Sequence, residues 1–171
     1  MTLIPTLQTE RLTLRAPQQG DYPALAEFYA SERSHFVGGP QTHAQTWRTL
    51  AAEIGHWHLR GYGRWAVEET ATGAFCGMVG PWCPEGWPEP EIAYDLMGGF
   101  EGKGYATEAA TAALDFVFNT LNWKTAISFV APENHASAAL ARRLGAQQEG
   151  TFDLGKLGTV NIFRHPKEAR I

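Results

Sequence analysis

The chain has 171 residues, of which 44% are apolar and 19% are charged, and its formal net charge is -4. This size and composition allow one domain, residues 1–171, to bury a core without disulfides or metals. The acidic balance and the lack of a basic stripe exclude a nucleic-acid protein held by phosphate neutralisation. No stretch approaches the roughly 18 apolar residues of a membrane span, and the start lacks a secretory signal. We therefore expect a cytoplasmic protein in which Cys76 and Cys83 stay reduced.

The first expected elements are a strand and a helix. Residues 11–15 alternate between polar and apolar, which is typical of a strand, and Pro17 and Gly20 then break it. Asp21 is placed to cap a helix that reaches about Tyr29.

A second amphipathic helix is expected after Thr42, which forms a capping-box pattern with Gln45, and Gly61 supplies its end. The apolar stripe of this helix comprises Trp47, Leu50, Ala51, Ile54 and Trp57. His58 falls on the same stripe and is expected in the core. His56 and His58 point about 160° apart on a helix, so they do not form a metal site.

The rest of the chain alternates between strands and helices. We expect strands at 64–69, 75–81 and 91–96, a helix from 105 to 121, a strand at 125–130, a helix at 134–144, and strands at 147–152 and 159–165. The order β-α-α-β-β-β-α-β-α-β-β predicts a mixed sheet with helices on both faces. The loop 81–90, rich in Pro and Trp, is either part of an acceptor wall or a stiff connector.

A glycine-rich loop joins the strand at 91–96 to the longest helix. Glycines let consecutive backbone N–H groups approach a phosphate, and the first turn of a helix adds unpaired donors. A Walker loop would need Gly at Met97 and Ser or Thr at Gly104, and a dinucleotide fingerprint would need Gly or Ala at Thr107. The loop therefore predicts an anion site of another kind.

The segment 101–106, Glu-Gly-Lys-Gly-Tyr-Ala, resembles the phosphate loop of the GNAT acyltransferase superfamily. Residues 102–109 closely resemble the corresponding motif of its RimJ/RimL-like branch. Residues 9–15 look like the opening strand of that branch. Residues 132–137, followed by 144–146, look like its Asn-x-x-Ser helix. The resemblance spans almost the whole chain. It implies an α/β (α+β) fold with a mixed, mostly antiparallel sheet, a splayed central strand and helices on both faces.

In that family the loop amides bind the pyrophosphate of CoA. The resemblance carries this role to Gly102, Lys103, Gly104, Tyr105, Ala106 and Thr107. The splayed strand pairs with the pantetheine arm and the Asn-x-x-Ser helix flanks it, which implies roles for Leu96 and Asn134, with acetyl-CoA as cosubstrate. Glu101 departs from the Gln or Arg of the family pattern and places a negative charge near a polyanion.

Acetyl transfer to an amine needs a base for the ammonium and a proton source for the leaving thiolate. Glu91 matches a glutamate common at this place in the branch and is the candidate base; alternatively it is a solvated strand-end carboxylate. Ser137 is the candidate acid; alternatively Asn134 is a plain N-cap and Ser137 a first-turn residue. Glu108 is expected to be solvated or to face the helix dipole.

Two functions are consistent with these residues. One is an enzyme that acetylates a primary amine, either a peptide α-amine or a small amine. The other is a non-catalytic acyl-CoA sensor that keeps the anion-binding glycine loop, here called the cradle, and lacks a general base. Neither involves nucleic acid or a membrane, and the chain is expected to be a monomer or a homodimer. No recognisable nucleophile turn accompanies a Ser/His/Asp or Cys/His set, so direct transfer without an acyl-enzyme is expected.

Overall fold

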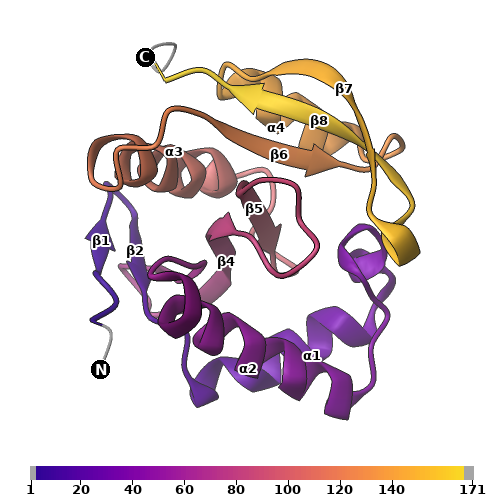
Figure 1. Ribbon diagram of the computed structural model, residues 1–171. Coiled ribbons are helices and arrows are strands. Elements are labelled where there is room, and N and C mark those ends of the chain that lie inside the picture. The colour runs from indigo at the N-terminus through magenta and orange to yellow at the C-terminus, as the bar shows by residue number, and fades with distance from the viewer. Residues whose placement is uncertain (1–2, 168–171) are drawn as a thin grey trace.

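A computed structural model describes residues 3–167 and shows eight strands in one sheet with four α-helices (Figure 1). The strands are β1 (Leu7–Gln8), β2 (Leu12–Arg15), β3 (Trp65–Glu69), β4 (Phe75–Trp82), β5 (Glu91–Leu96), β6 (Ala126–Val130), β7 (Gln147–Asp153) and β8 (Thr159–His165). The helices are α1 (Tyr22–Ala30), α2 (His43–Arg60), α3 (Tyr105–Asn119) and α4 (His135–Arg143), with 3-10 turns η1 (Gln19–Asp21), η2 (Glu32–Val37) and η3 (Gly155–Leu157). The expected order of elements is confirmed, and β1 is added before it.

The sheet runs β1-β2-β3-β4-β5-β6-β8-β7 and is antiparallel except between β5 and β6. Those two central strands are parallel and share a single registered pair, Glu91 with Ile127. Beyond that pair, the Ser128 hydroxyl donates to the Ile92 carbonyl at 2.6 Å in place of a backbone ladder. The strands therefore diverge towards the carboxyl end of β5, which confirms the predicted fold class with its splayed central strand.

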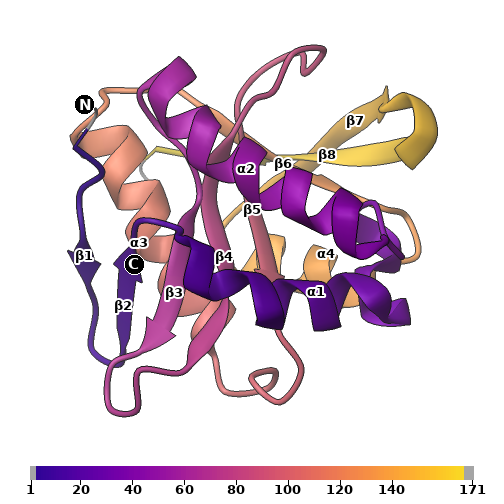
Figure 2. The same ribbon diagram turned by 90° about the horizontal axis from the view of Figure 1, so that it is seen from below.

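Helices cover both faces of this sheet, as Figure 2 shows. On one face, α1 and α2 pack through Leu25, Phe28 and Leu50 against Met78 of β4. On the other face, α3 brings a buried arc of Ala109, Ala110, Ala113, Leu114 and Val117 against the strands. Small alanines let the helix backbone approach the sheet closely. Its N-terminus, which follows the glycine loop, is fixed by this packing.

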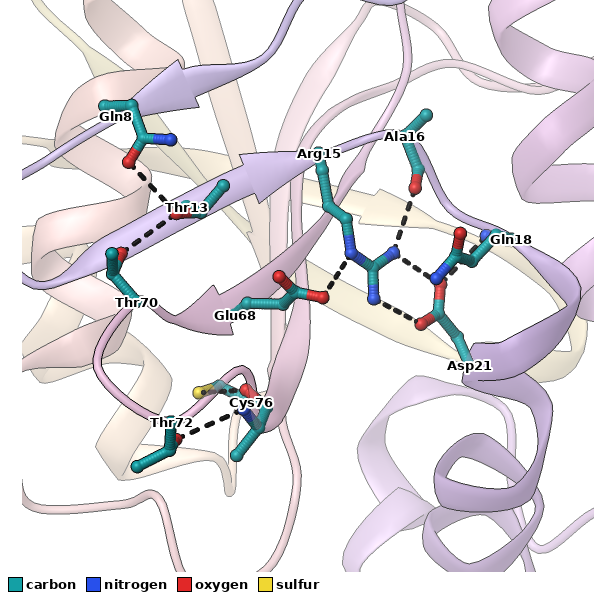
Figure 3. Close-up of polar contacts among 11 residues, drawn as sticks. Gln8, Thr13, Arg15, Ala16, Gln18, Asp21, Glu68, Thr70, Thr72 and Cys76 are labelled. Carbon is teal, nitrogen blue, oxygen red and sulfur yellow. Dashed lines mark hydrogen bonds and ion pairs between the residues drawn. The ribbon is translucent and has the colours of Figure 1, made fainter.

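The start of α1 is tied to the sheet by Arg15 (Figure 3). The guanidinium of Arg15 donates to both carboxylate oxygens of Asp21, at 3.0 and 2.7 Å, and also pairs with Glu68 of β3. Asp21 is at the predicted N-cap position of α1, but its side chain caps nothing there. It accepts from Arg15 and from the backbone N–H of Gln18 instead, because it is buried beside that cation.

The predicted stripe of α2 is correct at Leu50 and Trp57, which are buried, but wrong at its flanking positions. His58 and Trp47 are exposed, Trp47 by 54%, whereas polar Thr46, Glu53 and His56 are buried. The buried polar side chains have partners: for His56, Nδ1 bonds the Tyr62 carbonyl at 2.8 Å and Nε2 accepts from the Cys83 N–H at 2.9 Å. Hydrogen bonding thus turns the helix away from the orientation that apolarity alone predicts.

Both cysteines, Cys76 and Cys83, are free and buried, as expected for reduced thiols. Among the described residues, no helix is both long enough and apolar enough to cross a membrane.

Candidate active site

A cleft of about 1180 Å³ extends along β5 from the glycine loop to the start of the strand. Every residue that the sequence assigns to the site lines this cleft except Lys103. The cleft-lining members of that set are Glu91, Leu96, Gly102, Gly104, Tyr105, Ala106, Thr107, Asn134 and Ser137. Lys103 instead lays its ammonium over the rings of Phe100 and Tyr105, at 5.4 and 5.7 Å from their centres. Trp82, the last residue of β4, and Trp87 of the loop that follows also line the cleft.

The glycine loop has the geometry of an anion cradle. Gly102 and Gly104 adopt φ angles of 73° and 79°, which side chains rarely tolerate. A Cβ added at Gly102 would meet no atom within 4 Å, so the space over the loop is open to a ligand. Gly104 is the N-cap of α3, and no side chain caps this end of the fifteen-residue helix. The unpaired N–H groups and the helix dipole therefore fit the pyrophosphate of CoA.

Arg11 and Glu108 brace this cradle from the side. The Arg11 guanidinium donates to the Lys103 carbonyl at 2.8 Å and to the Glu108 carboxylate at 2.7 Å. The backbone N–H of Arg11 and the hydroxyl of Thr9 donate to the same carboxylate. Despite partial burial, these hydrogen bonds hold the pKa of Glu108 below its ordinary value. Glu108 is therefore not a solvated carboxylate; it lies in the first turn of α3, in agreement with the second alternative, and links the loop to the start of β2.

Glu91 is buried at the other end of the cleft, with 7% of its surface exposed. The indole N–H of Trp87 donates to one carboxylate oxygen at 2.9 Å, and the backbone N–H of Phe129 donates to the other at 3.1 Å. Burial raises the pKa of Glu91 from 4.5 to about 7, against the effect of these donors. The alternative of a solvated surface carboxylate is wrong. A carboxylate that titrates near neutral pH is well matched to accept a proton.

Ser137 and Tyr94 meet across the cleft from α4 and β5. The Ser137 hydroxyl donates to the Tyr94 phenol oxygen at 3.2 Å, and the phenol donates to the Ser137 carbonyl at 3.2 Å. Burial raises the pKa of Tyr94 to about 12, so the phenol keeps its proton at neutral pH. Asn134 is the N-cap of α4, since its side-chain oxygen accepts from the Ser137 N–H at 3.1 Å. Both Asn134 and Ser137 thus have a local structural function and also face the cleft.

Comparison with known proteins identifies the family. The model of the acetyltransferase (GNAT) domain matches residues 11–147, which is most of the chain and includes the cradle, Glu91 and Ser137. The chain belongs to the GNAT acetyltransferase family. An uncharacterised N-acetyltransferase, p20 of Bacillus licheniformis, is 32% identical over 149 residues, covering 85% of this chain and 84% of that protein.

Solved structures of GNAT proteins share the fold. An acetyltransferase from Agrobacterium tumefaciens is 39% identical, with 95% of each chain covered and a TM-score of 0.88. RimL, a ribosomal L7/L12 alpha-N-protein acetyltransferase solved in complex with coenzyme A, is 20% identical, with 96% of this chain and 99% of that chain covered and a TM-score of 0.77. The RimJ/RimL-like resemblance of the sequence is thus matched by a shared fold.

The structure explains how this GNAT protein accommodates Glu101 at the start of its phosphate loop. The Glu101 carboxylate pairs with the guanidinium of Arg33, which follows α1, and accepts from the Gly99 N–H at 2.9 Å. Arg33 also donates to the Leu96 carbonyl at 3.1 Å. The negative charge that departs from the family pattern is therefore neutralised by a cation from outside the loop.

We expect Arg33→Ala to weaken CoA binding by up to about fivefold, because Glu101 then faces the CoA phosphates without its partner and exposed ion pairs of this kind contribute little more. The double variant Arg33→Ala/Glu101→Gln is expected to regain the wild-type affinity in calorimetric titrations. An equal loss of affinity with and without Glu101 would show that Arg33 contacts the cofactor itself.

Several residues of the cleft are not among those that the sequence assigns to the site. They are Tyr29, Arg33, Glu53, Arg64, Tyr94 and Asp95, all of which line it. Tyr94 carries a detectable signal, since it lies in the strand that ends at the predicted cradle. Asp95 is the next residue of the same strand, whereas the remaining four come from α1, α2 and the segments that follow them, and only the folded chain brings those four to β5.

Proposed function

We propose that this protein transfers the acetyl group of acetyl-CoA directly to a primary amine, either the α-amine of a peptide or that of a small molecule. The arrangement of β5 supports this most strongly: the sheet opens beside this strand, with an anion cradle after its last residue and a buried carboxylate at its first. A pantetheine arm laid along β5 from the cradle directs its thioester towards Glu91.

In this proposal Glu91 accepts a proton from the acceptor ammonium, directly or through a water molecule. Removing the proton from a lysine-like ammonium at neutral pH costs roughly 4.5 kcal/mol, whereas removing it from an α-ammonium costs only about 1 kcal/mol. The amine nitrogen then attacks the thioester carbon, a C–N bond forms, the C–S bond breaks, and the nitrogen releases its second proton through water to the group that protonates the thiolate. Tyr94 and Ser137, which share a hydrogen bond in the cleft, supply the proton for the leaving thiolate.

Two measurements test this function. Millimolar CoA is expected to raise the melting temperature, because the folded cradle binds the ligand and the unfolded chain does not. Release of free thiol from acetyl-CoA is expected only when a suitable amine is present. A protein that binds CoA yet releases no thiol with any amine in a broad panel would be an acyl-CoA sensor, and the absence of any thermal shift would remove CoA as a ligand.

A further inference from the structure

The wall of the cleft contains a buried ionic cluster that the proposed chemistry does not use. We define it as Glu53 of α2, Arg64 just before β3, and Asp95 of β5. The Arg64 guanidinium donates to the Glu53 carboxylate at 3.0 Å through Nε and to the Asp95 carboxylate at 2.6 Å through Nη1. All three residues line the cleft, together with Tyr29 and Trp82. The guanidinium lies 5.6 Å from the centre of the Trp82 ring.

This cluster is short of positive charge. Its side chains are 8% exposed or less, and two carboxylates share one guanidinium. Both bonds from Arg64 to Glu53 reach the same oxygen, Oε1, and the other oxygen, Oε2, is buried without a hydrogen-bond partner. Burial raises the pKa of Glu53 above its ordinary value, against the effect of Arg64. A buried carboxylate oxygen left unpaired is costly, so the cluster gains free energy from any further cation or donor.

We propose that the cluster of Glu53, Arg64 and Asp95 is an acceptor subsite that binds a second cationic group of the amine substrate. The inference rests on the proposed acetyl transfer and specifies its substrate class as amines that carry two positive charges, such as α,ω-diamines and polyamines. One amine is acetylated near Glu91 while the other ammonium donates to Glu53 Oε2, with the ring of Trp82 beside it.

The positions of the two carboxylate groups on β5 agree with this assignment. Glu91 and Asp95 are four residues apart on one strand and face the same side of it, so their Cα atoms lie about 13 Å apart. The positive charge of Arg64 lowers the pKa of Glu91 and the negative charge of Asp95 raises it, so the cluster and Glu91 are close enough to interact electrostatically. A flexible substrate of a few methylene groups can therefore reach from the cluster towards the base within one cleft.

The first test compares substrates on the wild-type protein. With saturating acetyl-CoA, α,ω-diamines of increasing length are assayed for thiol release, each against the monoamine of the same length. After correction for the two equivalent ends, the best diamine is expected to exceed its monoamine in kcat/KM by about 10-fold or more, the usual scale for a charge-assisted hydrogen bond. Equal kcat/KM values for diamines and monoamines would overturn the inference and leave the proposed acetyl transfer intact.

The second test removes the charge that the subsite presents. Glu53→Gln is expected to abolish the preference for diamines over monoamines of the same length, because it removes the negative charge that holds the second ammonium. The matched control is Glu27→Gln, which alters an exposed carboxylate of α1 and is expected to keep the preference. A preference retained in folded Glu53→Gln contradicts the assignment.

Because Glu53 is buried beside Arg64, its substitution can disturb the fold, and a third test uses the wild-type protein without turnover. A diamine with two dimethylated nitrogens cannot form an amide, so it is not acetylated. Each nitrogen is protonated near neutral pH and keeps one N–H to donate. Calorimetry in the presence of CoA is expected to show that this diamine binds at least 10-fold more tightly than the dimethylated monoamine of the same length. Equal binding of the two probes overturns the subsite, whether or not any amine is acetylated.

Discussion

Glu91→Gln is expected to lower kcat by roughly 10²- to 10⁴-fold near neutral pH, the usual scale for loss of a general base, while CoA binds with unchanged affinity. The substitution keeps the size of the side chain and removes its basicity. Steady-state kinetics with a lysine-like amine measure the effect most clearly, because such an amine needs the base most. Raising the pH is expected to restore much of the rate, since free amine then becomes abundant without help.

The control for this experiment is Glu85→Gln. Glu85 lies in the loop that leads to β5 and its side chain is fully exposed, so its substitution removes a carboxylate without touching the buried site. If Glu91 only attracts cations, its variant raises KM with little change in kcat, and added salt narrows the difference from the wild type. Unchanged kcat and KM in Glu91→Gln would assign the base elsewhere.

The pKa of Glu91 also links activity to stability. The wild-type kcat/KM is expected to rise as the pH increases through about 7, where the carboxyl group loses its proton, and the Gln variant lacks this inflection. The folded state holds this proton more tightly than the unfolded chain, so the Glu91 contribution to stability is full below about 4.5 and is lost as the pH rises to about 7.

This rise in pKa corresponds to about 3 kcal/mol in the free energy of unfolding. Glu91→Gln loses one of the two hydrogen bonds from Trp87 and Phe129 at every pH, but it has no proton to release. The wild type therefore loses stability as the pH rises from 5 to 8, and the free energy of unfolding of the variant should increase relative to that of the wild type over the same range. Urea titrations at both pH values measure the change, and a constant difference would mean that Glu91 is not protonated in the folded protein.

The sequence predicts this fold well wherever a local pattern decides the structure. The apolar arc of α3 identifies its buried face correctly because alanine, leucine and valine there pack on the sheet without polar partners. The same reasoning succeeds only in part on α2, where Glu53 and His56 are buried because Arg64, Tyr62 and Cys83 bond to them, with only Glu53 Oε2 left unpaired. Those partners are set by tertiary structure, so no helical periodicity reveals them.

The candidate site divides in the same way. The cradle is a continuous segment whose glycines are visible in the sequence, and the structure gives Gly102 and Gly104 the backbone angles that such a loop needs. The buried ionic cluster of the cleft is assembled from separate elements. Glu53 and Asp95 are 42 positions apart in the chain and meet only through Arg64, so neither stands out as a site residue before the chain is folded.

Gly102→Val is expected to weaken CoA binding by roughly 5- to 150-fold. A β-branched residue at a positive φ angle costs about 1 to 3 kcal/mol, so the free loop relaxes to another conformation, and binding must restore the strained one. The isopropyl group also occupies the open space over the loop, where the pyrophosphate approaches the backbone. Isothermal titration with CoA measures the loss of affinity.

Gly73→Val is the matched control, because it introduces the same side chain under the same backbone strain. Gly73 lies in the turn between β3 and β4 with a φ angle of 72°, against 73° at Gly102, and a Cβ at either position meets no atom within 4 Å. Both variants should therefore lose similar stability in thermal unfolding without ligand, while only Gly102→Val loses CoA affinity. Because the strain is matched, the difference in binding isolates the role of the cradle. Equal CoA affinity in the two folded variants would place the phosphate site outside residues 102–107.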